Sequence, residues 1–277
     1  MSSLVVNTNL SAINAYNNLN VTDTNMSTAI SELSSGLSIQ TAANGPAAYV
    51  QSQALQSQAN GYQQAISNAQ DGVSLVQTAS GALNQISSIL QTMNQLAISS
   101  ANGATNDSTS LAANQQEFSA LQSTIDQIAN TTSYGTTNLL NGSFANQTLQ
   151  VGAFGMTSNQ IAFTIAGAST GALGITTGTV SVSSASAAFA AISAVQGAIS
   201  SIDAIGANVG AIQNELQAVA ANLTVGQQNL SAANSQLTNV NMAQEMTVFS
   251  TDQILMQTGT AMLSQAQQAP ALVEKLI

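Results

Sequence analysis

The stretch YQQAISNAQDGVSLVQTASGALNQISSILQTMNQLA, residues 62–97, decides how this sequence folds. Its apolar residues recur at alternating intervals of three and four, which is the spacing of one buried helix face and the period of a coiled coil. At about 1.5 Å per residue, the pattern predicts a helix roughly 55 Å long from about residue 61 to 99. The stripe consists of Tyr62, Ile66, Ala69, Val73, Val76, Ser80, Leu83, Ile86, Leu90, Met93 and Ala97.

Similar stripes predict helices on both sides of this one. A short stripe runs from Phe118 to Ile128, and a long one starts at Phe189 and continues to Val240. The N-terminal stripe is patchier, because a polar stretch at residues 17–20 interrupts it. Helices of this kind gain most of their stability by burying their stripes against each other. We therefore expect the helices to return antiparallel and to pack as one bundle.

Two local signals predict where helices end. The turn Asn44-Gly45-Pro46 is expected to close the first helix and to open an irregular segment. The polar run from Asn102 to Ser110 is expected to be a loop between two helices, with Asp107 as the N-cap of the second helix.

Residues 131–186 have a different character, since Gly, Ser, Thr and Asn dominate there. Short alternating stretches at residues 148–151, 160–165 and 179–182 predict strands joined by glycine-containing turns. The predicted fold class is therefore mainly α, a long antiparallel helical bundle or coiled coil with a small β-hairpin insert.

The composition excludes several classes of function. The 277 residues include 1 Lys+Arg, 11 Asp+Glu, no His and no Cys, for a formal net charge of −10. Without imidazole or thiol groups, His-based catalysis and the usual zinc sites are impossible. A chain with this charge cannot neutralise a phosphate backbone or favour an anionic membrane surface, so we expect no nucleic-acid and no membrane partner. No apolar run reaches about 18 residues, and the N-terminus lacks the basic region of a cleavable signal peptide.

No group of residues forms a recognisable catalytic, cofactor or metal site. Glu245 and Asp252 are the closest carboxylates in sequence, and on a helix they lie roughly 10 Å apart, too far to share one ion. The Gly-rich run 167–178 is expected to form turns, and Lys275 to lie in a frayed tail. The methionines are expected to pack inside the bundle rather than to line a binding groove. They are Met242, Met246, Met256 and Met262.

The stripes at the two chain ends suggest a different role. They carry few large aromatic residues, and a lone pair of such helices buries little apolar surface. One hypothesis is that these ends are disordered in the monomer and become ordered in a polymer; the alternative is a self-contained bundle. The residues expected at subunit contacts are Val6, Leu10, Ile13, Met26, Ile30, Leu33, Leu37, Leu237, Val240, Ile254, Leu255 and Met262.

Several motifs resemble bacterial flagellins. Ser34-Ser35-Gly36-Leu37-Ser38-Ile39 resembles the family's Ser-Ser-Gly-Leu-Arg-Ile element. The block from Asn68 to Thr78, followed by Gly81-Ala82-Leu83, is similar to the flagellin block with Asn-Asp-Gly-Ile-Ser, then Gln-Thr and Gly-Ala-Leu. The C-terminal matches are residues 210–214, 229–233 and 253–266, with Pro270. Together they cover about residues 3–165 and 187–277.

The resemblance implies an architecture and a role. Residues 1–45 and 232–277 would be paired terminal helices in the inner layer of a filament, around a narrow export channel. Residues 46–231 would form the outer layer, with its β element at about 131–186 and room for an insert only at 166–186. The implied protein is a minimal flagellin, exported unfolded and polymerised outside the cell for motility. The implied partners are further copies of the chain, an export chaperone, and the cap and hook-junction proteins.

The sequence departs from the family mainly at its charges. Ser38 stands where flagellins usually have Arg, and residues 233–239 and 90–96 have amides and hydroxyls at charged positions. Recognition by the vertebrate flagellin receptor is therefore not expected, because Thr92 and Asn94 cannot make Arg-centred contacts. In strong acid, carboxylates are neutralised while Arg stays charged, so salt bridges fail. This chain would carry only about +2 there, which suggests a filament made for acid surroundings.

Three alternatives remain at this stage. The nearest is the hook–filament junction protein, which resembles flagellin in its terminal helices, although Gly259–Leu263 and Asp71-Gly72 favour flagellin. The second is a ligand for host immune receptors, and the third is an enzyme. An enzyme is disfavoured because no catalytic constellation exists.

Overall fold

The computed structural model describes residues 8–274, with the surroundings of side chains described for residues 8–268. The chain divides into two compact units. The terminal unit comprises residues 1–57 and 230–277, and the central unit comprises residues 58–229. Val6, one of the residues expected at subunit contacts, lies outside the described residues.

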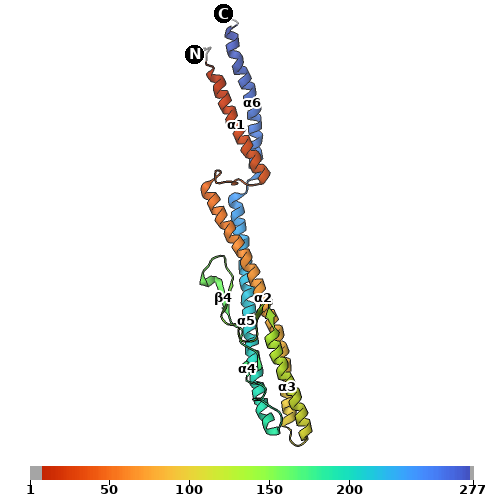
Figure 1. Cartoon of the computed structure of the whole chain (residues 1–277). Coiled ribbons are helices and arrows are strands. Elements are labelled where there is room, and N and C mark those ends of the chain that lie inside the picture. The colour runs from red at the N-terminus through yellow and green to blue at the C-terminus, as the bar shows by residue number, and fades with distance from the viewer. Residues whose placement is uncertain (1–7, 275–277) are drawn as a thin grey trace. The chain divides into compact units, whose positions relative to one another are not determined.

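Long helices form over the segments where the apolar spacing predicts them (Figure 1). The fold class is confirmed, since in the part of the chain that the structure describes long helices dominate and two short antiparallel strand pairs accompany them. The helix predicted at residues 61–99 is longer than expected, with 56 residues. In order, the helices are α1 (Leu10–Ser35), α2 (Pro46–Ala101), α3 (Ser108–Thr131), α4 (Thr170–Leu173), α5 (Ala185–Thr238) and α6 (Met242–Glu274), with a 3₁₀ turn η1 at Thr157–Asn159.

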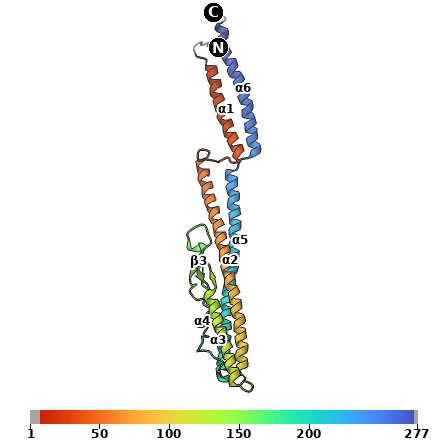
Figure 2. The same ribbon diagram turned by 45° about the vertical axis from the view of Figure 1, so that its right-hand side comes forward.

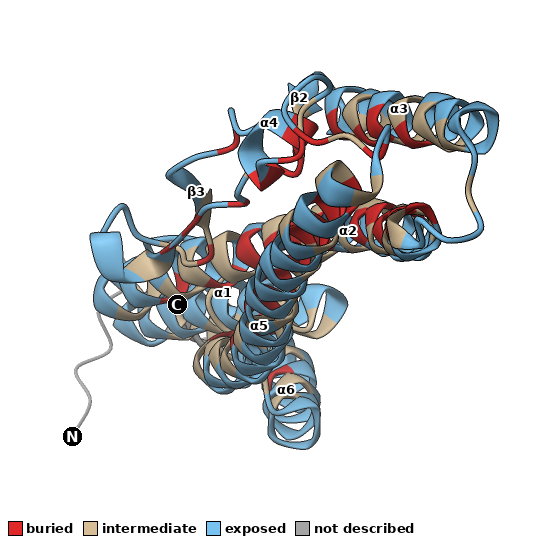
Figure 3. Ribbon diagram, turned by 90° about the horizontal axis from the view of Figure 1, so that it is seen from below, coloured by how far each residue is buried: buried red, intermediate tan, exposed pale blue. Residues whose placement is uncertain are grey.

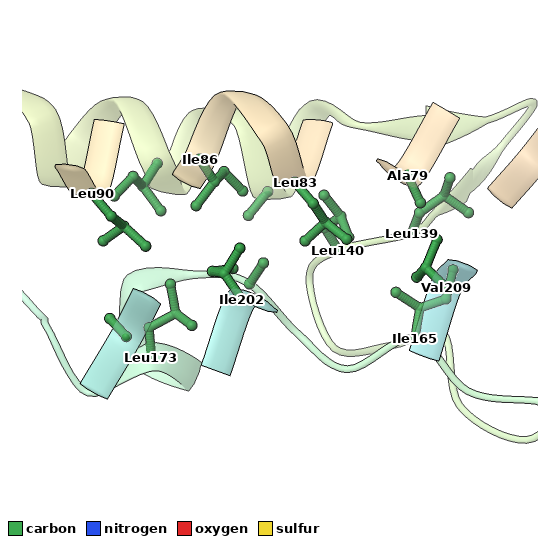
Figure 4. Packing of buried hydrophobic residues seen from close by; sticks show 14 of the residues in the cluster. Ala79, Leu83, Ile86, Leu90, Leu139, Leu140, Ile165, Leu173, Ile202 and Val209 are labelled. Atoms are coloured by element: carbon green, nitrogen blue, oxygen red, sulfur yellow. The ribbon is translucent and has the colours of Figure 1, made fainter. Parts of the chain in front are cut away.

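In the central unit, α2 and α5 lie antiparallel and bury their stripes against each other. Gly72 of α2 lies close to Leu216 of α5, and Tyr62 lies close to Gly226. Ile86, Leu90 and Met93 are fully buried, and Figure 4 shows the first two facing Ile202 and other apolar side chains. The facing sides of α2 and α3 are also buried (Figure 3). A continuous apolar core thus stabilises this unit.

By length and composition alone, α5 is apolar enough to cross a bilayer, with a mean hydropathy of 1.4 over an 18-residue window. Core helices pass the same test, and 28% of this window is buried inside the protein. Ala188, Val195 and Ile202 are among the buried residues of α5.

The small strands connect α3 to α5. β1 (Ser133–Tyr134) pairs with β2 (Thr137–Asn138), and β3 (Gln147–Gln150) pairs antiparallel with β4 (Gln160–Phe163). The β3–β4 hairpin matches the strands predicted at residues 148–151 and 160–165. It buries Ile161 and Phe163 on the face toward the core, as the alternation requires.

The strand predicted at residues 179–182 is wrong. Val180 and Val182 are buried at alternate positions, as in a strand, but their backbone groups bond to side chains of α3. The Val182 N–H donates to Gln115 Oε1 at 2.6 Å, and Gln122 Nε2 donates to the carbonyl of Val180 at 3.5 Å and of Ile175 at 2.8 Å. Side-chain amides therefore take the place of a neighbouring strand.

The hydrogen bonds that Gln122 donates to the Ile175 and Val180 carbonyls, here called the Gln122 clamp, give a first prediction. We expect Gln122→Leu to lower the free energy of unfolding by about 1–3 kcal/mol, because it leaves the Ile175 carbonyl buried and unpaired. Urea denaturation followed by circular dichroism measures this change. Ser123→Ala, at the exposed neighbouring position, is the control and should leave the midpoint unchanged. Equal midpoints for both variants would contradict the clamp.

The turn at Asn44-Gly45-Pro46 does not close the first helix. α1 ends at Ser35, and Gly36 adopts the left-handed conformation (φ 75°) that favours glycine, donating its N–H to the Glu32 carbonyl. Pro46 instead begins α2, where the missing N–H of proline costs nothing. The irregular segment therefore precedes Pro46.

Two other ends follow ordinary capping rules. Asp107 caps α3 as predicted, since its side chain accepts a hydrogen bond from the Ser110 N–H at 2.7 Å. The break between α5 and α6 is held by a short ladder, in which Ser38 N–H donates to the Thr238 carbonyl at 2.7 Å and Val240 N–H to the Gly36 carbonyl at 3.0 Å. These hydrogen bonds hold the C-terminal end of α1 close to the N-terminal end of α6.

Candidate assembly surface

The terminal unit is built on α1 and α6, which lie side by side in antiparallel orientation (Figures 1 and 2). Near one end, Asn9 Nδ2 donates to the Ala266 carbonyl at 2.7 Å, and at the other end Leu37 pairs with Asn239. A Cβ atom added at Gly259 would lie 3.1 Å from Leu19 Cδ1, so this glycine permits a close approach of α1. These contacts fix the register of the pair.

The helix pair buries very little. Among the described side chains of α1 and α6, only Ala29 and Asp252 are buried. The central unit, by contrast, holds large side chains such as Phe118 and Leu216 at 0% exposure. The two helices therefore cannot gain much stability from each other, because burial of apolar area is the main source of such stability.

About half of the apolar residues expected at subunit contacts are exposed on the surface of this unit. Leu10, Ile13, Ile30, Ile254, Leu255 and Met262 are exposed, with exposed fractions from 46% to 67%. Met26, Leu33, Leu37, Leu237 and Val240 are half-buried. The sequence stripes identified helices correctly, but they did not show which stripe residues would stay uncovered.

Sequence reasoning misjudged the methionines and missed other apolar residues. Met242, Met246 and Met262 were expected to pack inside the bundle, but they are about half exposed or more, and Met256 is half-buried. Tyr16, Val21 and Val248 are exposed as well. The composition of α6 could have indicated this exposure, because the helix has more apolar residues than its contact with α1 can cover.

Two carboxylates far apart in sequence influence each other electrostatically across the helix pair. Glu32 of α1 and Glu245 of α6 are both half-buried. Burial raises the pKa of the Glu32 carboxyl above its ordinary value, and the negative charge of Glu245 raises the pKa further. The residues described contain no cluster of three or more Asp or Glu side chains that could hold a metal ion.

The raised pKa of Glu32 gives a second prediction. The paired helices favour the protonated carboxyl, so pairing gains stability as pH falls through the raised pKa and loses it above that pKa. We therefore expect Glu32→Gln to stabilise the helix pair at pH 7, with the difference from the parent shrinking toward pH 4. Amide hydrogen exchange of α1 at both pH values measures it. Asp23→Asn, at an exposed position of α1, is the control, and a looser pair in Glu32→Gln at pH 7 would contradict the prediction.

Comparisons with known proteins match both ends of the chain. Residues 6–145 match the family model of the bacterial flagellin N-terminal helical region, and residues 192–277 match that of the C-terminal helical region. A flagellin of Halalkalibacterium halodurans is 35% identical over 274 residues, which is 99% of this chain and 100% of the relative. A flagellin of Clostridium tyrobutyricum is 48% identical over 114 residues, which is 41% of this chain and 30% of the relative.

A solved structure shows the same similarity. The crystal structure of Bacillus cereus flagellin is 29% identical, with a TM-score of 0.50 over 61% of this chain and 94% of that chain. The match with this chain spans only 30%, 34% and 39% of the length of three curated relatives. The stretch between the two family matches, residues 146–191, contains the β3–β4 hairpin and α4.

Proposed function

The chain belongs to the bacterial flagellin family, and from this premise we propose that it is the structural subunit of a flagellar filament. Many copies would associate through the terminal unit. The observation that carries this proposal is the exposure of large apolar side chains on α1 and α6, such as Leu10 at 67% and Met262 at 64%. Water contact with such side chains is unfavourable, so covering them with further copies would stabilise the polymer.

Flagellins are structural proteins, which confirms the expectation that the chain is not an enzyme. We propose that residues 1–45 and 232–277 form the inner layer of the filament and that residues 46–231 form its outer layer. The short connection between β4 and α5, residues 164–184, supports a thin outer surface, because it leaves little room for an insert.

Electron microscopy of the purified protein tests this function. We expect long filaments once the protein exceeds its critical concentration. Short rings or no polymer would contradict the proposal, and rings would favour the hook–filament junction protein instead. That alternative is not favoured by the curated relatives, which are named flagellins.

The proposal also places the protein outside the cell, where its partners would be the cap and hook-junction proteins, after passage with an export chaperone. We propose that the vertebrate flagellin receptor does not recognise the chain. Of the segment 90–96, Leu90 and Met93 are buried, and Thr92 is an exposed neutral residue at a position where flagellins have Arg. A receptor reporter assay with purified filaments should give no signal.

We propose in addition that the filament suits acid surroundings. With 1 Lys+Arg in the whole chain, salt bridges can contribute little to contacts between subunits, which draw mainly on apolar side chains, amides and hydroxyls. Hydrogen bonds between amides involve no titrating group, so they persist when carboxylates are protonated.

A further inference from the structure

One polar side chain in the terminal unit lies in an unusual place. Asp252 of α6 is only 7% exposed, and its Oδ2 has no hydrogen-bond partner among the described residues. The side chain lines a hollow of about 340 Å³ together with Gln244, Thr247, Val248 and Thr251. Buried polar atoms are normally hydrogen-bonded, and an unpaired one costs free energy, so this carboxylate requires an explanation.

Apart from the Gln244 amide, which can donate as well as accept, the polar side chains of the hollow offer acceptors. The Thr247 hydroxyl donates to the Ala243 carbonyl at 2.9 Å, and the Thr251 hydroxyl donates to the Thr247 carbonyl at 2.8 Å. Both hydroxyl protons are therefore used within α6, which leaves only their lone pairs facing the hollow. A ligand suited to this site must bring an N–H or O–H group that can donate to the Asp252 carboxylate.

The hollow lies beside an apolar stripe on the outer face of α6. Val248, Leu255 and Met262 follow one another at seven-residue intervals, so they share one face of the helix, and they are 41%, 48% and 64% exposed. Val248 is also part of the hollow. The carboxylate therefore opens onto the surface that the proposed function covers with another subunit.

We propose that the hollow beside Asp252 receives an N–H or O–H donor from a second copy of this chain and thereby fixes how neighbouring subunits dock. This inference rests on the proposed function. The donor is a neutral amide or hydroxyl group, because the chain contains 1 Lys+Arg but many Asn, Gln, Ser and Thr residues. A buried carboxylate that accepts such a hydrogen bond gives direction to an interface that apolar contacts alone would leave unspecific.

The test compares three full-length variants in polymerisation. Asp252→Ala should raise the critical concentration about tenfold or more, because the donor of the second copy loses its acceptor on burial. Asp252→Asn keeps one acceptor oxygen and should recover part of that loss. Asp23→Ala removes the same charge from an exposed position of α1 and should polymerise like the parent.

Hydrogen exchange of α6 in the dilute monomer separates docking from a structural role. In Asp252→Ala the protection should be unchanged or higher, because an unpaired buried carboxylate is removed. Polymerisation of Asp252→Ala at the parent's critical concentration would overturn the docking role, and so would a loss of polymer matched by an equal loss of α6 protection. If the parent itself forms no polymer, the proposed function fails as well, so the two failures are distinguishable.

Discussion

The variant with Ile254, Leu255 and Met262 all replaced by Asn is expected to form no filaments at concentrations where the parent polymerises. These side chains are 60%, 48% and 64% exposed, so about half of each remains to be buried in a polymer. Full burial of such a side chain contributes about 1.5–3 kcal/mol. Half of that for three residues is about 2–4.5 kcal/mol, which corresponds to a critical concentration about 50- to 2,000-fold higher. Sedimentation and negative-stain electron microscopy measure the change.

A matched variant carries three similar replacements in the central unit. Ile98, Phe189 and Val225 are 52%, 64% and 57% exposed, and their joint replacement by Asn removes a comparable amount of apolar surface. We expect its critical concentration to rise less than tenfold. Equal damage from both triple variants would mean that assembly does not depend especially on the terminal unit.

Filaments of this protein are expected to stay intact at pH 2–3. The formal charge of the subunit changes from −10 at pH 7 to about +2 in strong acid, so repulsion between neighbouring copies falls. At pH 7, low salt should weaken the filament because screening is lost, whereas at pH 2.5 salt should matter less. The sedimentable fraction across pH and salt concentration is the measurement.

Thr92→Arg provides the comparison, since Thr92 is exposed. It adds a cation that acid cannot neutralise, so it should weaken filaments more at pH 2.5 than at pH 7. Parent filaments that fragment at pH 2–3 while surviving near neutrality would show that the scarcity of Lys and Arg has another cause.

The helices could be predicted because their signals are local. The three-and-four spacing around residues 62–97 required Ile86, Leu90 and Met93 on one face, and all three are fully buried. Asp107 could be recognised as an N-cap from its place before a stripe. Such features depend on residues within one or two helical turns, so no knowledge of the partner helix is needed.

The remaining features depend on contacts between distant segments. Nothing near Val180 indicates that Gln122 of α3 bonds to its carbonyl, so the alternation at residues 179–182 predicts a strand. The electrostatic influence of Glu245 on Glu32 follows only from the register of α1 against α6. The end of α1 at Gly36 had a local signal, but the stronger turn residues at 44–46 outweighed it.

The extent of the candidate assembly surface also depends on contacts between distant segments, so the sequence indicates it only in part. A stripe shows that one helix face is apolar, but it does not show how much of that face its own chain covers. Leu33 and Leu37 are half-buried, whereas Leu10 and Ile254 remain exposed, although all four belong to the predicted set. Whether a stripe residue is half-buried or exposed depends on whether the opposite helix has a large side chain to cover it.

Amide hydrogen exchange on the intact protein, measured once as dilute monomer and once as filament, shows whether the terminal helices become stable only on assembly. We expect amides of Leu10–Ser35 and Met242–Glu274 to be weakly protected in the monomer and to exchange much more slowly in the filament. Amides around Ile86 and Met93 should be slow in both states, because their core is complete within one chain. Terminal helices as strongly protected in the dilute monomer as this core would contradict the account.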